Sequence, residues 1–318
     1  MTLADDYRLI HEGAALGATA PRRQIGLTGR DRASYLQGLL TNDIQALTPG
    51  TGCYAAWLSP QGRMLTDMHV LQSATMLLLD LPAATEQTTR DRLEQFIFTE
   101  DVQVAALADH LTSVWIHGPQ AAAVLQQTLD GAPSLEAWAD YRHAPLMFRD
   151  APVSVARIDQ LGVPGFSVFL EPAMAPLLTA VLEQSGAAPV SPAALEAARL
   201  EAAYPLFGQD MTDEIIPLEA GIEGRAISFS KGCYVGQEIV IRVLHRGQGR
   251  VAKKLVPLRF AGTVPAAGSR LHAGDRDIGF VTSVAESPRL GAIGLGYVHR
   301  DFTAAGTALR EGSVASQS

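Results

Sequence analysis

The residues best suited to chemistry lie in the stretch SFSKGCYVGQEIVIR, which covers residues 228–242. A primary amine and a thiol stand two positions apart there, at Lys231 and Cys233. The chain has only three lysines and two cysteines, so this pair stands out from its composition. An amine beside a thiol predicts a reactive cysteine or a ligand contact. The alternative role for Cys233 is a small buried side chain.

Acidic residues form the second group of candidates. Glu201 shares a helical stripe with three alanines, so it faces either water or a pocket. A pocket carboxylate can accept two hydrogen bonds from a ring that carries an amino group beside a ring N–H, as pterins and guanines do. In GRMLTDMHV, a strand places Asp67 on a polar face that lies either in water or in a site. Asp43 follows a helix, where a local cap or turn is equally suitable.

The elements that must position these residues alternate irregularly between strands and helices. We predict strands at 24–28, 53–58, 63–71, 75–80, 101–106, 111–117, 152–158 and 165–170. We predict helices at 31–40, 85–98, from Pro119, at 173–185 and from Pro192 to Pro205. From about Val235 both a short helix and a strand remain open, because the run EIVIRV is rich in β-branched residues. After residue 246, short β-type runs with glycine turns predict a small barrel.

The whole pattern is therefore α+β followed by all-β, which argues against a regular Rossmann sheet. The length of 318 residues suits two or three domains. A net charge of −8 does not favour nucleic acid, and no apolar run is long enough to span a membrane. The start lacks a targeting signal, so we expect a cytoplasmic protein. Two cysteines exclude a disulfide scaffold and a four-thiolate cluster held by one chain, and no zinc-type spacing predicts a metal site.

Several motifs carry a family resemblance. KGCYVGQE (231–238) matches the signature K-G-C-Y-x-G-Q-E, and supporting matches are YLQGLLTNDI (35–44), LSPQGRMLTDM (58–68), RLEAAYPLFGQDM (199–211), PLEAGI (217–222) and GFVTS (279–283). On these residues the chain resembles the folate-binding aminomethyltransferase superfamily, the glycine-cleavage T-protein group. It is most similar to the YgfZ-type branch of that group.

The resemblance implies an interleaved aminomethyltransferase-like, folate-binding body over residues 1–245, built from two α+β subdomains, and a C-terminal β-barrel over 246–318. It also implies tetrahydrofolate as the ligand, with Glu201 recognising the pterin edge. Arg242 is predicted on its charge to meet the anionic folate tail. Asp43 and Tyr234 are further candidate ligand contacts. We expect Glu201 and the Lys-Gly-Cys loop to open onto one hollow.

One departure from the family concerns catalysis. True aminomethyltransferases carry an acidic pair in G-G-x-x-D-D, and here the first acid is replaced by Thr66, which leaves Asp67 alone. A threonine is not ionised at pH 7, and losing such a group typically costs about 10²–10⁴ in rate. We therefore do not expect glycine-cleavage activity and leave open whether the chain is an enzyme.

Three functions follow from these residues. The main prediction is a tetrahydrofolate-binding accessory protein in iron–sulfur cluster assembly or repair, which acts through Lys231 and Cys233. Its partners would be iron–sulfur enzymes or cluster-assembly proteins, and the branch implies an indirect link to tRNA modification. The alternative is a tetrahydrofolate-dependent aminomethyltransferase or demethylase that uses Asp67. The third is a thiol redox sensor that does not bind folate.

Overall fold

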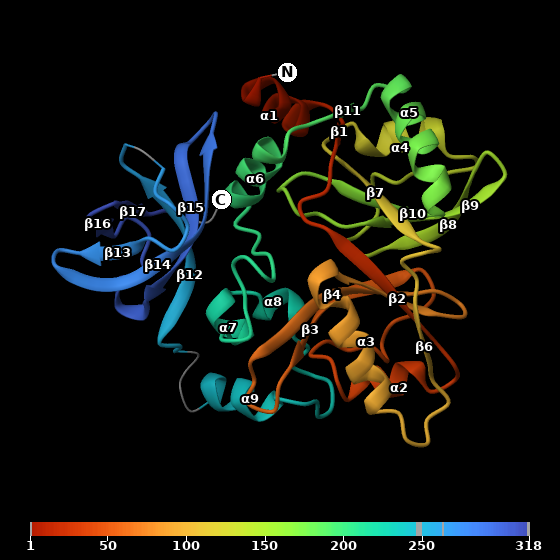
Figure 1. Ribbon diagram of the computed structural model, residues 1–318, viewed down its shortest axis with the longest axis horizontal. Coiled ribbons are helices and arrows are strands. Elements are labelled where there is room, and N and C mark those ends of the chain that lie inside the picture. The colour runs from red at the N-terminus through yellow and green to blue at the C-terminus, as the bar shows by residue number, and fades with distance from the viewer. Residues whose placement is uncertain (1, 246–249, 263, 317–318) are drawn as a thin grey trace.

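The computed structural model describes residues 2–245, 250–262 and 264–316 and arranges them in three lobes. Figure 1 shows two lobes of sheets and helices on one side and an all-β lobe, drawn in blue, on the other. Short helices drawn in green lie between them: α6 (Pro192–Glu201), α7 (Pro217–Ala220) and α8 (Glu223–Ala226). The two mixed lobes form the predicted body.

The first sheet of the body is antiparallel, in the order β3-β4-β5-β2-β6. Its elements are β2 (Arg22–Thr28), β3 (Thr51–Leu58), β4 (Met64–Gln72), β5 (Leu77–Pro82) and β6 (Gln103–Ala106), with helices α2 (Arg32–Gln37) and α3 (Glu86–Gln95). One face packs on these helices, and the other packs on the second lobe and the barrel. The central strands β4 and β5 are therefore buried on both faces.

The second sheet has the order β11-β1-β7-β10-β9-β8. Its elements are β1 (Ala15–Leu16), β7 (Thr112–His117), β8 (His143–Phe148), β9 (Ala151–Arg157), β10 (Gly165–Leu170) and β11 (Ala188–Pro189), with helices α4 (Ala121–Thr128) and α5 (Ala175–Gln184). Strand β1 precedes the whole first sheet in the chain, yet it pairs with β7 and β11. The two lobes are thus interleaved, and the predicted α+β body is confirmed.

The third lobe is a nearly closed all-β barrel with the strand order β13-β14-β15-β12-β17-β16. Its strands are β12 (Lys253–Phe260), β13 (Arg270–Ala273), β14 (Arg276–Ser287), β15 (Gly291–His299), β16 (Ala308–Leu309) and β17 (Gly312–Val314). The amide of Arg310 donates to the carbonyl of His272 at 2.9 Å, which brings the last hairpin back to β13. Short 3₁₀ turns complete the elements at Ala83–Thr85, Pro172–Met174 and Arg300–Phe302.

Helices α7 and α8 were not predicted from the sequence, and two further helices bear on the prediction. Helix α1 (Leu3–Glu12) was not predicted, although Thr2 and Asp5 cap its start reciprocally. Residues Gln237–His245 form helix α9, not a strand. Val240 is buried there while Ile241 is exposed, as in an amphipathic helix. In the described ranges, no helix combines the length and hydropathy needed to cross a membrane.

The body and the barrel share one hydrophobic core. Leu58 and Met64 of the first sheet pack with Leu255, Leu295 and Tyr297 of the barrel, and each of these side chains is almost fully buried. Segments from three parts of the chain therefore converge beside β3 and β4, where the polar residues of the site lie.

Candidate functional site

Asp67 and His69 lie on β4 and point into the interior, where they are 4% and 0% exposed. The imidazole of His69 contacts the rings of Tyr54, Trp115 and Tyr141. Tyr54 comes from the first sheet, Trp115 from the second, and Tyr141 from the segment before β8, so these rings cover the face that the sequence could have left in water. The strand is therefore not half-exposed, and Asp67 belongs to a buried cluster.

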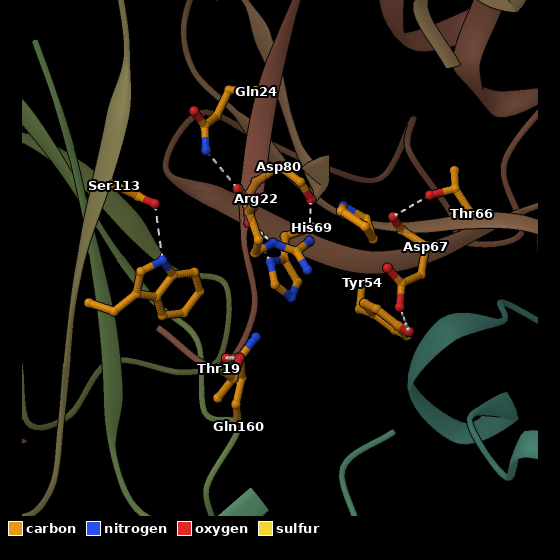
Figure 2. Close-up of polar contacts among 12 residues, drawn as sticks. Thr19, Arg22, Gln24, Tyr54, Thr66, Asp67, His69, Asp80, Ser113 and Gln160 are labelled. Carbon is orange, nitrogen blue, oxygen red and sulfur yellow. Dashed lines mark hydrogen bonds and ion pairs between the residues drawn. The ribbon is translucent and has the colours of Figure 1, made fainter. Parts of the chain in front are cut away.

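The two oxygens of the Asp67 carboxylate differ in their hydrogen bonds to the described residues. The hydroxyl of Tyr54 donates to Asp67 Oδ2 at 2.7 Å (Figure 2). Asp67 Oδ1 is buried and accepts no hydrogen bond within the part of the chain that the structure describes. A buried polar atom without a partner typically costs about 1–3 kcal/mol. Asp67 Oδ1 is thus a candidate to receive a hydrogen bond from a ligand.

Arg225 lies against the same cluster. Its guanidinium carbon is 4.7 Å from the ring centroid of Tyr54 and 4.0 Å from that of Tyr204. Burial disfavours the charged form, but the surrounding phenol groups and Asp67 raise the pKa of Arg225, so the side chain stays charged. Its Nη2 is buried and lacks an acceptor among the described residues. Arg225 also lines a cavity of about 240 Å³ beside the barrel.

Next to Asp67 and Arg225 lies a row of buried, hydrogen-bonded polar side chains. Asp80 Oδ2 is 2.5 Å from Arg22 Nε and 2.9 Å from His69 Nδ1, and Figure 2 shows the three side chains together. His69 Nε2 is 3.4 Å from the hydroxyl of Tyr204. Burial and the charge of Arg22 lower the pKa of His69, so the imidazole is neutral. Because Asp80 accepts from Nδ1, Nε2 is left to accept from Tyr204.

Lys231 is buried, and its ammonium is fully engaged. Its side-chain nitrogen donates to the carbonyls of Gln37, Leu40 and Asn42 at 2.7, 2.6 and 2.9 Å. These carbonyls lie at and just beyond the end of α2, where a helix leaves its last carbonyls without partners. The lysine of the Lys-Gly-Cys loop thus stabilises a helix end.

The rest of this loop is divided between the interior and the surface. Tyr234 is buried, with its ring centroid 5.0 Å from Lys231 Nζ, and Asp43 acts on the same ammonium through its charge. The structure therefore brings together three of the predicted site residues. Cys233 is exposed, which excludes the alternative of a small buried side chain.

Glu201 lies at the end of α6, between α1 and the barrel. The alanines of its stripe are buried, so this face points inward and not to water. Its carboxylate accepts from Tyr7 at 2.9 Å and from Ser287, and it forms an ion pair with Arg289. Glu201 and Arg289 line a cavity of about 90 Å³. A pterin that bound here would have to replace one of these partners.

Arg242 lies on α9 and lines a different cavity, of about 1030 Å³. Arg63 and Lys253 add positive charge to its wall, while Asp213 and Glu219 add negative charge. Figure 1 places α6 and α9 well apart along the body. The structure therefore does not support the expectation that the end of α6 and the Lys-Gly-Cys loop open onto one hollow.

Comparison with known proteins places this geometry in a family. Residues 2–231 match the family model described as the GCVT N-terminal domain, and residues 253–311 match the glycine cleavage T-protein C-terminal barrel domain. The chain belongs to the glycine cleavage T-protein family. The match to the N-terminal domain alone covers well over half of the sequence.

Relatives in the T-protein family carry a consistent name. The aminomethyltransferase of Rubrobacter xylanophilus is 31% identical over 92% of this chain and 78% of its own length. That of Bacillus subtilis is 28% identical over 96% of this chain and 85% of its own length. The crystal structure of the glycine cleavage system aminomethyltransferase T from Bartonella henselae has a TM-score of 0.87 at 25% identity, covering 99% of this chain and 88% of that one.

These relatives correct the main functional prediction. An accessory role in iron–sulfur cluster assembly is wrong as the first interpretation, because full-length relatives at about 30% identity are named aminomethyltransferase. The predicted ligand class is confirmed at the level of the family, since T-protein aminomethyltransferases use tetrahydrofolate as substrate or cofactor.

The cluster around Asp67 fits a reduced pterin chemically. A pterin edge presents amino and ring N–H donors beside a carbonyl acceptor. Among the described residues, Asp67 Oδ1 is an acceptor without a donor, and Arg225 Nη2 is a donor without an acceptor. The rings of Tyr54, Tyr141 and Tyr204 surround them with flat apolar surface. Within the described residues, no group of acids, histidines and cysteines is arranged to hold a metal ion.

Sequence reasoning missed most of this cluster. Asp80 was detectable, because it interrupts the apolar run LLLDLP, where an acid must find a buried partner. Arg225 gave no signal, since an arginine in IEGRAIS is equally suited to a surface turn. In the sequence, Tyr54 and Tyr204 look like ordinary core residues. Only the fold shows that both rings pack against Arg225.

Proposed function

We propose that this protein transfers one-carbon units to tetrahydrofolate, as an aminomethyltransferase or a demethylase. The observation that carries the proposal is the buried carboxylate of Asp67, whose Oδ1 is without a hydrogen bond among the described residues and lies in one cluster with the charged Arg225. Membership of the T-protein family supports the same ligand.

Each residue of the cluster has a distinct task in this proposal. Asp67 accepts a hydrogen bond or a proton at Oδ1, while Tyr54 fixes the carboxylate through Oδ2. Arg225 donates from Nη2, which has no acceptor among the described residues, and the ring of Tyr204 packs against the guanidinium. Bound tetrahydrofolate would supply the nitrogen atoms that receive the one-carbon unit. Burial excludes bulk water, which strengthens each of these interactions.

Thr66 does not replace the missing acid of the family motif. Its hydroxyl lies 2.8 Å from that of Thr85 and 3.2 Å from the backbone carbonyl of Asp67, within the buried strand. A neutral hydroxyl with these partners stabilises β4 and carries no charge. The proposed chemistry therefore rests on one ionisable group, Asp67.

The finer assignments also remain proposals. The eight-residue signature KGCYVGQE supports a place in the YgfZ-type branch, in which the exposed thiol of Cys233 is a candidate reactive group. Glu201 and Arg242 are proposed secondary folate contacts, and they line separate cavities. Asp43 and Tyr234 interact with the ammonium of Lys231, and we propose that they influence a ligand indirectly, through this lysine.

The test is the variant Asp67→Asn, assayed for methylene-tetrahydrofolate formation from an aminomethyl donor, whose transferred carbon is already at the oxidation level of the product and which releases ammonia and the free carrier. We expect the rate to fall by about 10²–10⁴, because an amide cannot take up the proton or carry the charge. Folate affinity, measured by titration calorimetry, should change much less, since the amide oxygen still accepts a hydrogen bond.

The matched control is Asp109→Asn, which makes the same change at an exposed acid. It should keep the wild-type rate. A variant Asp67→Asn that retains the wild-type rate would remove Asp67 from the mechanism. A wild-type protein that binds tetrahydrofolate but forms no methylene-tetrahydrofolate from any donor would contradict the proposed function itself.

A further inference from the structure

The lysine of the Lys-Gly-Cys loop is better placed to organise the site than to react. Only 9% of Lys231 is exposed, and its nitrogen donates to the carbonyls of Gln37, Leu40 and Asn42 at distances between 2.6 and 2.9 Å. A charged lysine has three N–H donors, whereas a neutral amine has two. Three carbonyl acceptors therefore require the ammonium form, which is not nucleophilic.

The segment that Lys231 fixes continues directly into the Asp67 cluster. The side-chain amide of Asn42 donates to the carbonyl of Tyr54 at 2.8 Å and to that of Arg225 at 3.1 Å. Its neighbour Thr41 donates to the carbonyl of Ala226 at 2.6 Å. One ammonium thus secures residues 40–42, and these hold the backbones of two residues that face the proposed ligand.

We propose that Lys231 is a positioning residue, whose ammonium clamps the segment 40–42 and thereby fixes Tyr54 and Arg225 around Asp67. The inference rests on the proposed function for its catalytic consequence. It gives the Lys-Gly-Cys signature a structural task that the motif alone did not reveal.

The groups that face Lys231 make the clamp sensitive to pH. Desolvation lowers the pKa of Lys231 to about 8, and the charge of Asp43 opposes this shift. Burial raises the pKa of Cys53 to about 12, so that thiol stays neutral while the lysine titrates. The ring of Tyr234 favours the ammonium as a cation–π partner. We therefore expect the clamp to weaken as the pH rises through about 8.

The functional test compares Lys231→Met with Lys254→Met, the same change at a half-buried lysine of β12. Loss of three hydrogen bonds to a charged group should lower kcat/KM by about 10-fold to 100-fold. The wild type and Lys254→Met should lose kcat/KM as the pH rises through about 8, and Lys231→Met should be low and flat there. A kcat/KM of Lys231→Met that does not change as the pH rises through about 8 distinguishes positioning by the ammonium from a general loss of stability.

A double-mutant cycle tests the route through Asn42. Asn42→Ala removes the side-chain amide but keeps the carbonyl that Lys231 contacts, so the two changes should not add. Additive effects of Lys231→Met and Asn42→Ala would overturn the proposed route. The proposal would also be overturned if Lys231→Met lost kcat/KM above about pH 8 as the wild type does.

A second measurement needs neither folate nor activity. The chain has three lysines, so ¹³Cε-lysine labelling gives a spectrum that can be assigned by single substitutions. We expect the ¹³Cε signal of Lys231 to titrate near pH 8. In a sample labelled at asparagine, the chemical shift of the Asn42 side-chain ¹³Cγ should change over the same pH range. If Asn42 does not respond, the clamp is wrong even in an active enzyme. If Asn42 responds in a protein without transferase activity, the clamp stands and the proposed function fails.

Discussion

His117 shows how a single buried side chain makes this fold sensitive to acid. Its Nε2 is 3.0 Å from the carbonyl of Gly17, and its ring stacks on Trp115. Burial lowers the pKa of His117 to about 4. Nδ1 is buried and has no acceptor among the described residues, so a proton added there would have no partner.

We therefore predict a pH-dependent loss of stability that belongs to this residue. The unfolded chain takes up the proton near pH 6.5 and the folded chain only near pH 4, so the stabilisation is complete above pH 6.5 and falls as the pH drops from 6.5 to 4. A shift of this size corresponds to about 3 kcal/mol. Urea unfolding of wild type and His117→Gln at pH 7, 5.5 and 4 measures it.

The comparison with His117→Gln removes the contribution of other groups. Glutamine can still donate to Gly17 but does not titrate, so carboxylates and other histidines affect both proteins alike. The difference in unfolding free energy between wild type and variant should shrink toward low pH. Parallel stability curves would show that His117 is already protonated or already accessible in the folded state.

Residue types identified candidates in the sequence but not their partners. Lys231 and Asp67 stood out in the sequence, Lys231 as one of only three lysines and Asp67 as the acid that remains of a family motif, and the structure shows both side chains buried. Their roles depended on contacts with Asn42 and Tyr54, which the topology brings together. Glu201 shows the limit of prediction from residue types, because its partner Arg289 comes from the barrel and no local sequence pattern predicts the pair.

At the scale of elements, Asp210 links α6 to the barrel. Arg199 is fully buried on α6, and its Nη1 lies 2.7 Å from Asp210 Oδ2. Asp210 Oδ1 accepts from the hydroxyls of Thr282 and Ser283 on β14, at 2.6 and 2.5 Å. The arginine of the R-L-E motif is therefore a structural residue.

Asp210→Ala should destabilise the protein by about 3–5 kcal/mol, because it leaves the charge of Arg199 buried without its acid partner on that side. Thr282→Val, which removes only one neutral donor to Asp210, should cost about 1 kcal/mol. Chemical denaturation of both variants at pH 7 measures the difference. Equal, small effects would mean that water or Glu196 compensates for the missing carboxylate.

The elements were predictable where a short-range pattern was strong. The strands predicted in the body follow apolar runs bounded by turn residues and agree with the structure to within a few residues, whereas β1, β8 and β11 were not predicted. Residues 237–245 are different, because β-branched residues favour a strand while tertiary contacts favour a helix. Ile239 packs against Gly62, where a side chain would collide with it. That contact lies far away in the sequence, so local propensity could not include it.

At the scale of the whole molecule, the sequence indicated a barrel after residue 246 but not how the barrel joins the body. A change of composition marks a boundary between segments, and it carries no information on the packing between them. In the structure Leu295 and Tyr297, which lie on the face of β15 turned toward the body, complete a core with Leu58 and Met64. Leu258, in contrast, lies in a core made only of barrel residues.

This arrangement predicts that the barrel and the body unfold as one unit. Leu295→Ala in the shared core and Leu258→Ala in the barrel core change equally buried leucines, each 1% exposed, and should each cost about 2–5 kcal/mol. Because neither lobe can keep the shared core covered alone, each variant should lower amide protection equally in β4 and in β15. Hydrogen exchange under conditions of global opening reads both strands in one experiment. If Leu258→Ala lowers protection in β15 and leaves β4 unchanged, the barrel opens independently, and the shared core does not couple the two lobes.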